Sequence, residues 1–280
     1  LARLIGASPK SLTFTSGGTE AIDLALRGVM ESAPPARDVL VTTRVEHASV
    51  RALAEHYEAQ GRVRYLALDA HGVVDLTRLG EVLDERVRVL SVQWANNETG
   101  AVQPVRAIAA AARRAGAFVH SDATQWVGKM PTDVEERGPG APPAWLDLLT
   151  FAPHKFHGPK GVGVLWARPG VPLRPRLLGT QERERRGGTE NVPGIAGAGA
   201  AGEAARAWLA DEGARVRAGA SRDEFERRVL EACRTNSGAV VNGPASGGPN
   251  ARLWNTTNIA FPRLEAEAIL LALSERGVYA

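Results

Sequence analysis

Cysteine is almost absent from this sequence. The 280 residues contain one, Cys233, so no disulfide can form within the chain and a zinc site built from several cysteines is excluded. A chain without internal disulfides is typical of a reducing compartment, and we expect a cytoplasmic protein. Cys233 lies in a charged helical pattern, which favours a buried structural thiol over a reactive one.

Long apolar runs and a strong charge of either sign are also missing. No apolar stretch reaches the roughly 20 residues that span a bilayer, and we find no signal peptide, so we expect no membrane partner. The formal net charge is only +3, and the basic residues are scattered apart from Arg183, Arg185 and Arg186. Because a nucleic-acid-binding protein gathers Lys and Arg on one face, we expect no nucleic acid partner.

Short apolar runs alternate with helical patterns over most of the chain. The runs are rich in Val and Leu, which is typical of strands buried on both faces of a sheet. This alternation predicts an α/β domain with a largely parallel sheet. The predicted strands are 11–15, 38–43, 63–68, 87–93, 117–122, 146–151 and 161–167, and the predicted helices are 19–32, 47–60, 76–85 and 104–115.

The composition changes after Asn191. A Gly/Ala-rich segment runs into a charged helical stretch that reaches Cys233, and a loop rich in Gly, Pro, Asn and Ser follows. We place a domain boundary near residue 206, within the long helical stretch. Residues 1–205 then form a large domain, and 206–280 form the first part of a smaller α+β domain with a predicted strand at 256–261 and a predicted helix at 265–276.

Both ends of the chain interrupt an element of structure. The first residues have the pattern of a helix end, and a further strand is predicted to begin at Val278. We therefore expect the chain to be an internal piece of a longer protein.

The segment Thr15–Glu20 joins a predicted strand to a predicted helix through two glycines. Such a turn can aim backbone N–H groups and the Thr19 hydroxyl at a phosphate, helped by the helix dipole. The alternative is a helix cap made by Thr19. Residues 183–191 offer a similar choice between a second phosphate contact and a solvated charged loop.

Two further polar segments follow predicted strands, where ligands gather in an open α/β sheet. Asp122 can pair with a protonated ring nitrogen; alternatively it caps the next helix. Lys155 lies between a strand end and a Gly-Pro loop, which suits a lysine that must be held in place to form a Schiff base. His154 and His157 flank it, but a third metal ligand at suitable spacing is missing, so we expect no metal site.

Six segments resemble, in order and spacing, the cysteine desulfurases of the class V aminotransferase group. Each is weak alone, and their register along the whole chain makes them specific together. The resemblance implies fold type I of the pyridoxal-phosphate (PLP)-dependent transferases, with a large, mostly parallel sheet domain and a smaller domain. The segments are Ser16–Glu20, Glu46–His47, Asn96–Gly100, His120–Gln125, His154–Gly161 and Arg186–Asn191.

The resemblance also implies roles for single residues. Lys155 is similar to the lysine that binds PLP covalently, and His47 to the histidine that stacks on the pyridine ring and assists proton transfer. Asp122 resembles the aspartate that pairs with the ring N–H and keeps the cofactor an electron sink. The other implied contacts are Gln125 with the ring oxygen, Asn97 near that oxygen and the substrate carboxylate, Gly18, Thr19 and His154 with the phosphate, and Thr189 with the phosphate of a neighbouring subunit.

The implied activity is removal of sulfur from L-cysteine, giving L-alanine and an enzyme persulfide for iron–sulfur cluster or thiocofactor assembly. The implied partners are a second copy in a homodimer and a sulfur-acceptor protein such as an iron–sulfur scaffold. Two alternatives stay open: another class V PLP enzyme, such as an aminotransferase, a selenocysteine lyase or an epimerase, and a non-catalytic PLP-binding scaffold. A scaffold would need none of Lys155, Asp122, His47 and Gln125.

Two features depart from the family pattern. The family's nucleophilic cysteine lies on a loop after the strand predicted here at Val278, so we expect it beyond Ala280 and expect the chain as given to be inactive. Ala152 stands where the family usually has a serine that reaches the phosphate. Loss of one hydrogen bond to a charged group costs about 1.5–3 kcal/mol of binding, and we expect weaker retention of PLP.

Overall fold

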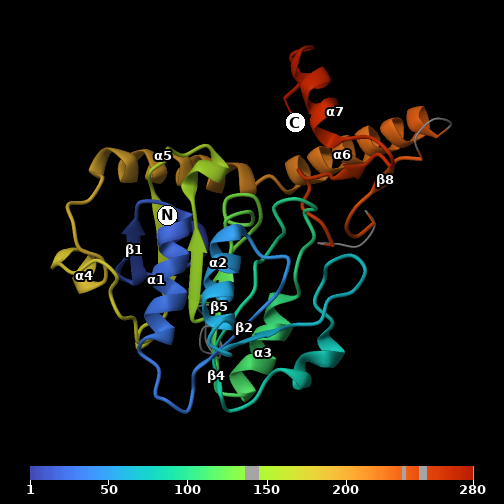
Figure 1. Ribbon diagram of the computed structural model, residues 1–280. Coiled ribbons are helices and arrows are strands. Elements are labelled where there is room, and N and C mark those ends of the chain that lie inside the picture. The colour runs from blue at the N-terminus through green and yellow to red at the C-terminus, as the bar shows by residue number, and fades with distance from the viewer. Residues whose placement is uncertain (136–144, 235–237, 246–250, 280) are drawn as a thin grey trace.

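A seven-stranded sheet lies at the centre of the protein. The computed structural model describes residues 1–135, 145–234, 238–245 and 251–279 (Figure 1). The strand order is β1-β7-β6-β5-β4-β2-β3, and β7 alone runs against the other six described strands of this sheet. The strands are β1 Leu12–Thr15, β2 Val39–Thr42, β3 Val63–Tyr65, β4 Val87–Ser91, β5 Phe118–Asp122, β6 Leu148–Phe151 and β7 Gly163–Ala167.

Helices cover both faces of this sheet, as predicted for an α/β domain. The helices α1 and α2 pack on one face, whereas α3, η1 and part of α5 pack on the other. The α-helices are α1 Gly18–Met30, α2 Ala48–Glu58, α3 Val105–Arg114, α4 Gln181–Glu184, α5 Val192–Leu209, α6 Glu212–Cys233 and α7 Ala266–Ser274, and the 3-10 helices are η1 Ala2–Ile5, η2 Pro9–Ser11, η3 Leu76–Glu81 and η4 Pro153–Phe156.

The apolar strands bury both of their faces. Along β7, Val164 and Trp166 pack into one core cluster, whereas Leu165 packs into the other. Side chains of successive strand residues point to opposite faces, so a central strand covered on both sides reads as a continuous apolar run. This is the pattern from which the sequence predicted the sheet.

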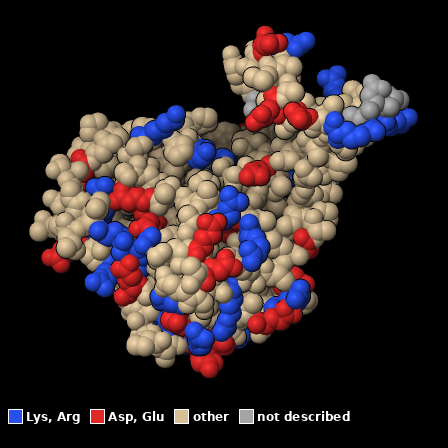
Figure 2. Space-filling model, viewed as in Figure 1, with Lys and Arg blue, Asp and Glu red and all other residues tan. Residues whose placement is uncertain are grey.

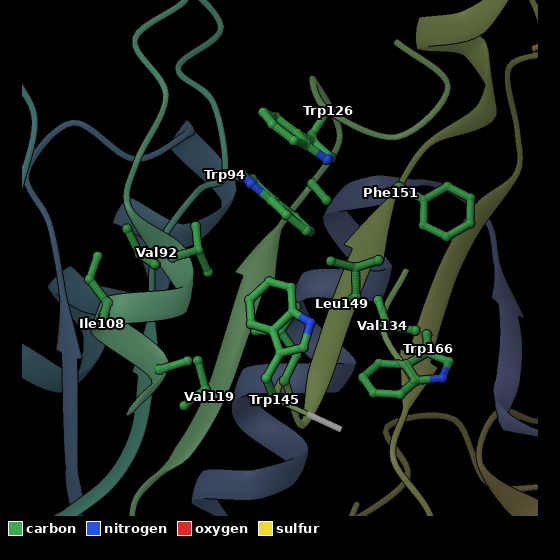
Figure 3. Packing of buried hydrophobic residues seen from close by; sticks show 14 of the residues in the cluster. Val92, Trp94, Ile108, Val119, Trp126, Val134, Trp145, Leu149, Phe151 and Trp166 are labelled. Carbon is green, nitrogen blue, oxygen red and sulfur yellow. The ribbon is translucent and has the colours of Figure 1, made fainter. Parts of the chain in front are cut away.

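Four tryptophans belong to the larger core cluster, and three of them contact one another (Figure 3). Trp94 and Trp126 stack with ring centroids 4.7 Å apart, and Trp145 meets Trp94 edge-on at 5.2 Å. Trp94 follows β4 and Trp126 follows β5. The stack therefore fixes the chain where these two strands end, because interlocked buried rings leave little room for movement.

The last part of the chain lies beside this body. Helix α6, the two-stranded sheet of β8 Val240–Val241 and β9 Ile259–Ala260, and helix α7 stand at the upper right of Figure 1. Residue 206 lies in the last turns of α5, and the break between α5 and α6 falls at residues 210–211. The predicted long helical stretch is therefore two helices.

Four local predictions are wrong. Leu76–Glu85 forms a short 3-10 helix that ends at Glu81, and the strand predicted at 256–261 is reduced to two residues because its partner β8 is equally short. Val278 begins no strand, since its N–H donates to Leu273 O after the end of α7. Cys233 is half-buried, because α6 buries only Glu226 among its residues.

Charged side chains of both signs are interspersed on the face shown in Figure 2, so no extended basic stripe lies on that face. None of the helices in the described part of the chain is long and apolar enough to cross a membrane.

Candidate active site

A cavity of about 310 Å³ lies at the carboxyl edge of the sheet. It collects segments that follow β1, β2, β4, β5 and β6, which run in the same direction and therefore end at the same edge. Eight of the nine predicted site residues line it: Gly18, Thr19, His47, Asn97, Asp122, Gln125, His154 and Lys155. The ninth, Thr189, is exposed on the loop before α5 and is not among the lining residues.

The glycine turn between β1 and α1 has the predicted strand–turn–helix form. Gly17 is the N-cap of α1, so the alternative in which Thr19 caps the helix is wrong. The Thr19 hydroxyl instead lies 2.8 Å from the Ser49 hydroxyl. The turn packs closely on β7, since a Cβ at Gly163 would stand 2.1 Å from Gly17 O. Gly18 and Thr19, the first residues of α1, line the cavity, so the start of a helix lies at its edge, where an anion can bind.

The arginine-rich segment near residue 186 docks against the first strand and helix. Arg186 forms an ion pair with Glu20 at 2.8 Å, and Glu20 also accepts from Ser16 N at 2.7 Å. Arg183 donates to Leu12 O, and Glu182 accepts from Phe14 N. These contacts connect the segment to β1, an edge strand of the sheet, and to Glu20 near the start of α1. The predicted phosphate contact of this segment stays a prediction.

His47 is the N-cap of α2. Its Nδ1 accepts from Ser49 N at 3.2 Å and lies 3.0 Å from Ser49 Oγ. A ring nitrogen that accepts a backbone N–H carries no proton, so the neutral ring is protonated on Nε2. This leaves Nε2–H as the donor on a side chain that lines the cavity.

Asp122 is a buried carboxyl at the last position of β5. It is 6% exposed, and its Oδ1 accepts from Thr124 N at 3.0 Å. Burial raises its pKa, while Thr124 and the more distant His47 lower it. Residues 124–126 form a turn and no helix follows directly, so Asp122 does not cap a helix as the alternative proposed. No ion pair to Asp122 exists within the described residues, so this carboxylate lacks a cationic partner.

Lys155 lies in the 3-10 helix η4, directly after β6. Its N–H donates to Ala152 O at 3.1 Å, and the turn closes at His157, whose φ is 68°. Burial, followed by the charges of Lys155 and Lys160, lowers the pKa of His154. A neutral His154 can donate to an anion without adding a second full charge beside Lys155.

Sequence reasoning missed five lining residues. Gln93, Ala95 and Thr124 lie within four residues of a strand end, so a rule that inspects every such position would have found them. Ile22 and Ser49 lie on helices and carry no sequence signal of their own. The five are Ile22, Ser49, Gln93, Ala95 and Thr124. Among the described residues no group of three or more His, Cys, Asp or Glu is placed to bind a metal ion.

The cavity fits PLP by its chemistry. A buried carboxylate without a cationic partner suits a protonated ring nitrogen, a lysine lies at the next strand end, and the start of α1 offers N–H donors for a phosphate. The fold and these side chains define a PLP-dependent enzyme of fold type I.

Comparisons with known proteins agree with this class. The family profile "Aminotransferase class-V" matches residues 1–280. A cysteine desulfurase of Gluconacetobacter diazotrophicus is 42% identical over 284 residues, covering 100% of this chain and 67% of the relative. The chain belongs to the class V aminotransferase family and, within it, to the cysteine desulfurases. It spans about two thirds of the length of its curated relatives.

Solved structures show the same relationship. A NifS-like protein superposes with a TM-score of 0.86 at 35% identity, covering 99% of this chain and 72% of that one. A structure described as SspA in complex with cysteine gives a TM-score of 0.76 at 29% identity, covering 98% and 72%.

Proposed function

We propose that the protein of which these 280 residues form part is a PLP-dependent cysteine desulfurase. It removes sulfur from L-cysteine and leaves L-alanine and a persulfide on the enzyme. The observation that carries the proposal is the convergence of Lys155, Asp122 and His47 on one cavity from three different strand ends. Family membership supports it, as does the similarity to SspA, whose structure is a complex with cysteine.

Each of the predicted site residues contacts a different part of the cofactor. Asp122 binds the ring N–H, Gln125 the ring oxygen, and His47 covers the ring face and assists proton transfer. The phosphate is held by Gly18, Thr19 and His154. Asn97 lies near the ring oxygen and the substrate carboxylate. When bound, PLP supplies an electron sink for the pair of electrons left at the substrate carbon.

Lys155 carries the covalent attachment and then acts as the base that moves the α-proton of L-cysteine. A protein thiolate attacks the substrate sulfur; an S–S bond forms, the C–S bond breaks, and the carbon that loses sulfur takes a proton to give alanine. Cys233, the single cysteine of this sequence, does not line the cavity. We therefore assign the attacking thiol to a part of the protein outside these residues.

We further propose a cytoplasmic homodimer that passes its sulfur to an acceptor such as an iron–sulfur scaffold. Thr189 is exposed on its loop, which leaves it available to reach the phosphate of a neighbouring subunit. We also propose that residues 1–205 form the PLP-binding domain and that residues 206–280 begin the smaller one.

The first test is an absorption spectrum after addition of PLP. A visible band that borohydride removes, and that is absent in Lys155→Ala, supports the assignment. Lys160→Ala is the matched control, because Lys160 is an exposed lysine close in sequence that does not line the cavity. A well-folded wild type without the band would contradict PLP binding.

Sulfide release from L-cysteine by a chain extended past Ala280 then tests the reaction. If no sulfide is released although the band is intact, another class V enzyme is favoured.

A further inference from the structure

Lys129 lies beside the cavity without a carboxylate partner. Its Nζ donates to Gln125 Oε1 at 2.5 Å, and within the described residues no Asp or Glu lies within ion-pair distance of it. The side chain is half-buried, in the turn that follows β5. A half-buried ammonium whose single side-chain partner is a neutral amide is unusual, because buried charges are normally paired.

This contact decides which end of the Gln125 amide faces Lys129. A lysine ammonium has three donors and no acceptor, so only the amide oxygen can face it. The amide nitrogen must then lie on the other side of the group. No described residue accepts a hydrogen bond from Gln125 Nε2, and Gln125 lines the cavity. Gln125 therefore presents a hydrogen-bond donor, its Nε2–H, to a ligand in the cavity.

The backbone around Lys129 is held from three sides. Gly128 has a φ of 80°, and a Cβ there would stand 2.5 Å from Phe156 Cγ, so this turn packs directly on the residue after Lys155. Lys129 O accepts from Trp254 Nε1 at 3.1 Å. Trp126 is stacked on Trp94 in the core (Figure 3). A side chain on such a fixed turn can hold another in place.

We infer that Lys129 is a positioning residue, which fixes the Gln125 amide so that its N–H donates to the ring oxygen of PLP. The inference rests on the proposed function, since it names how one of that site's contacts is set. Burial, and then the charge of Lys155, lowers the pKa of Lys129 to about 8, so the ammonium form that makes this contact prevails at neutral pH.

The first experiment follows the visible band of the bound cofactor as a function of pH. A hydrogen bond donated to the ring oxygen lowers the basicity of that oxygen. The proton that it shares with the lysine nitrogen then has a lower pKa. Lys129→Met should therefore move the midpoint of the spectral change upward by about one pH unit. Lys129→Arg keeps a donor and should stay close to wild type. Unchanged midpoints in Lys129→Met would overturn the inference.

A double-mutant cycle separates positioning from a direct effect of charge. In a Gln125→Leu background, Lys129→Met should shift the midpoint by much less than in the wild type, because the amide through which it acts is gone. An equal shift in both backgrounds would show that Lys129 acts through its charge alone and would overturn the positioning role.

A second readout needs no cofactor. In the cofactor-free protein, lysines methylated with ¹³C-labelled formaldehyde are titrated by NMR, with Lys129→Arg identifying the Lys129 signal. Gln125→Leu should lower the Lys129 midpoint by about one pH unit, because the ammonium loses its acceptor. An unchanged midpoint contradicts the inference whatever the visible band shows. A wild type without the band contradicts the proposed function instead, so the two failures are distinguishable.

Discussion

The backbone N–H of Gln93 donates to both carboxylate oxygens of Glu46, at 3.1 and 3.0 Å. The Thr43 hydroxyl donates to the same carboxylate at 2.8 Å. Glu46 directly precedes His47 and is 3% exposed. The contact ties the loop after β2 to the segment after β4, so it holds His47 and Gln93 on adjacent walls of the cavity.

Because Glu46 is buried, we expect its contribution to the free energy of unfolding to depend on pH. Burial raises the pKa of Glu46 to about 8, so the folded protein binds this proton more tightly than the unfolded chain. The resulting stability is present below the unfolded pKa of about 4.5 and is lost as pH rises towards 8. Glu46→Gln cannot titrate. Its free energy of unfolding relative to wild type should therefore rise across this window by up to about 1.4 kcal/mol per pH unit. Urea unfolding of both proteins measures the difference, and a gap that is constant with pH would contradict the prediction.

We expect the contribution of His120 to the free energy of unfolding to have the opposite pH dependence, in a more acidic range. Its ring is fully buried between Ser91 Oγ at 2.8 Å and Thr150 Oγ1 at 3.0 Å, and burial lowers its pKa to about 3. The unfolded chain takes up the proton first, so stability present above about pH 6.5 is lost as pH falls towards 3.

His120→Gln should lose less stability than wild type as pH falls, and the difference in slope of the free energy of unfolding should reach up to about 1.4 kcal/mol per pH unit. Urea unfolding at a series of acidic pH values provides the measurement, and the exposed His71 replaced by Gln is the matched control. Equal acid sensitivity in wild type and His120→Gln would refute the assignment.

We expect any side chain larger than hydrogen at position 163 to displace the glycine turn between β1 and α1. A Cβ there would stand 2.1 Å from Gly17 O and 2.5 Å from Thr15 Oγ1. Gly163→Ala should lower the free energy of unfolding by about 1–3 kcal/mol and should weaken PLP retention, because the turn must move. Gly199→Ala is the control, since nothing lies within 4 Å of a Cβ there and α5 gains a better helix former. Thermal unfolding and PLP titration distinguish them; similar behaviour of both variants would count against the tight packing.

Ala152→Ser is predicted to strengthen PLP binding. Ala152 lines the cavity, and its Cβ stands 3.5 Å from where a Cβ would lie at Gly18, at the start of α1. A serine hydroxyl at this place can donate to a phosphate bound there. One such bond should improve the Kd for PLP about tenfold or more. Equilibrium titration of the visible band gives the Kd, and a Kd equal to that of wild type would disprove the expectation.

Most of the sheet and the positions of the site segments could be predicted from the sequence. The strands buried on both faces appear as apolar runs, and the ends of those runs place Asp122 and Lys155 at one edge. The predictions failed where structure depends on weak or distant partners. Leu76–Glu81 forms a 3-10 helix, and Cys233 is only half-buried because α6 buries a single one of its residues, Glu226.

The sequence by itself determined the kind of site, because residue types and their spacing along the chain specify which groups follow which strand. Only the tertiary structure decided how those groups are held. Arg186 and Glu20 are 166 residues apart and pair at 2.8 Å, and the Glu46 carboxylate meets a backbone N–H 47 residues away. Such contacts depend on the packing of elements that are distant in sequence, and spacing along the chain carries no record of them.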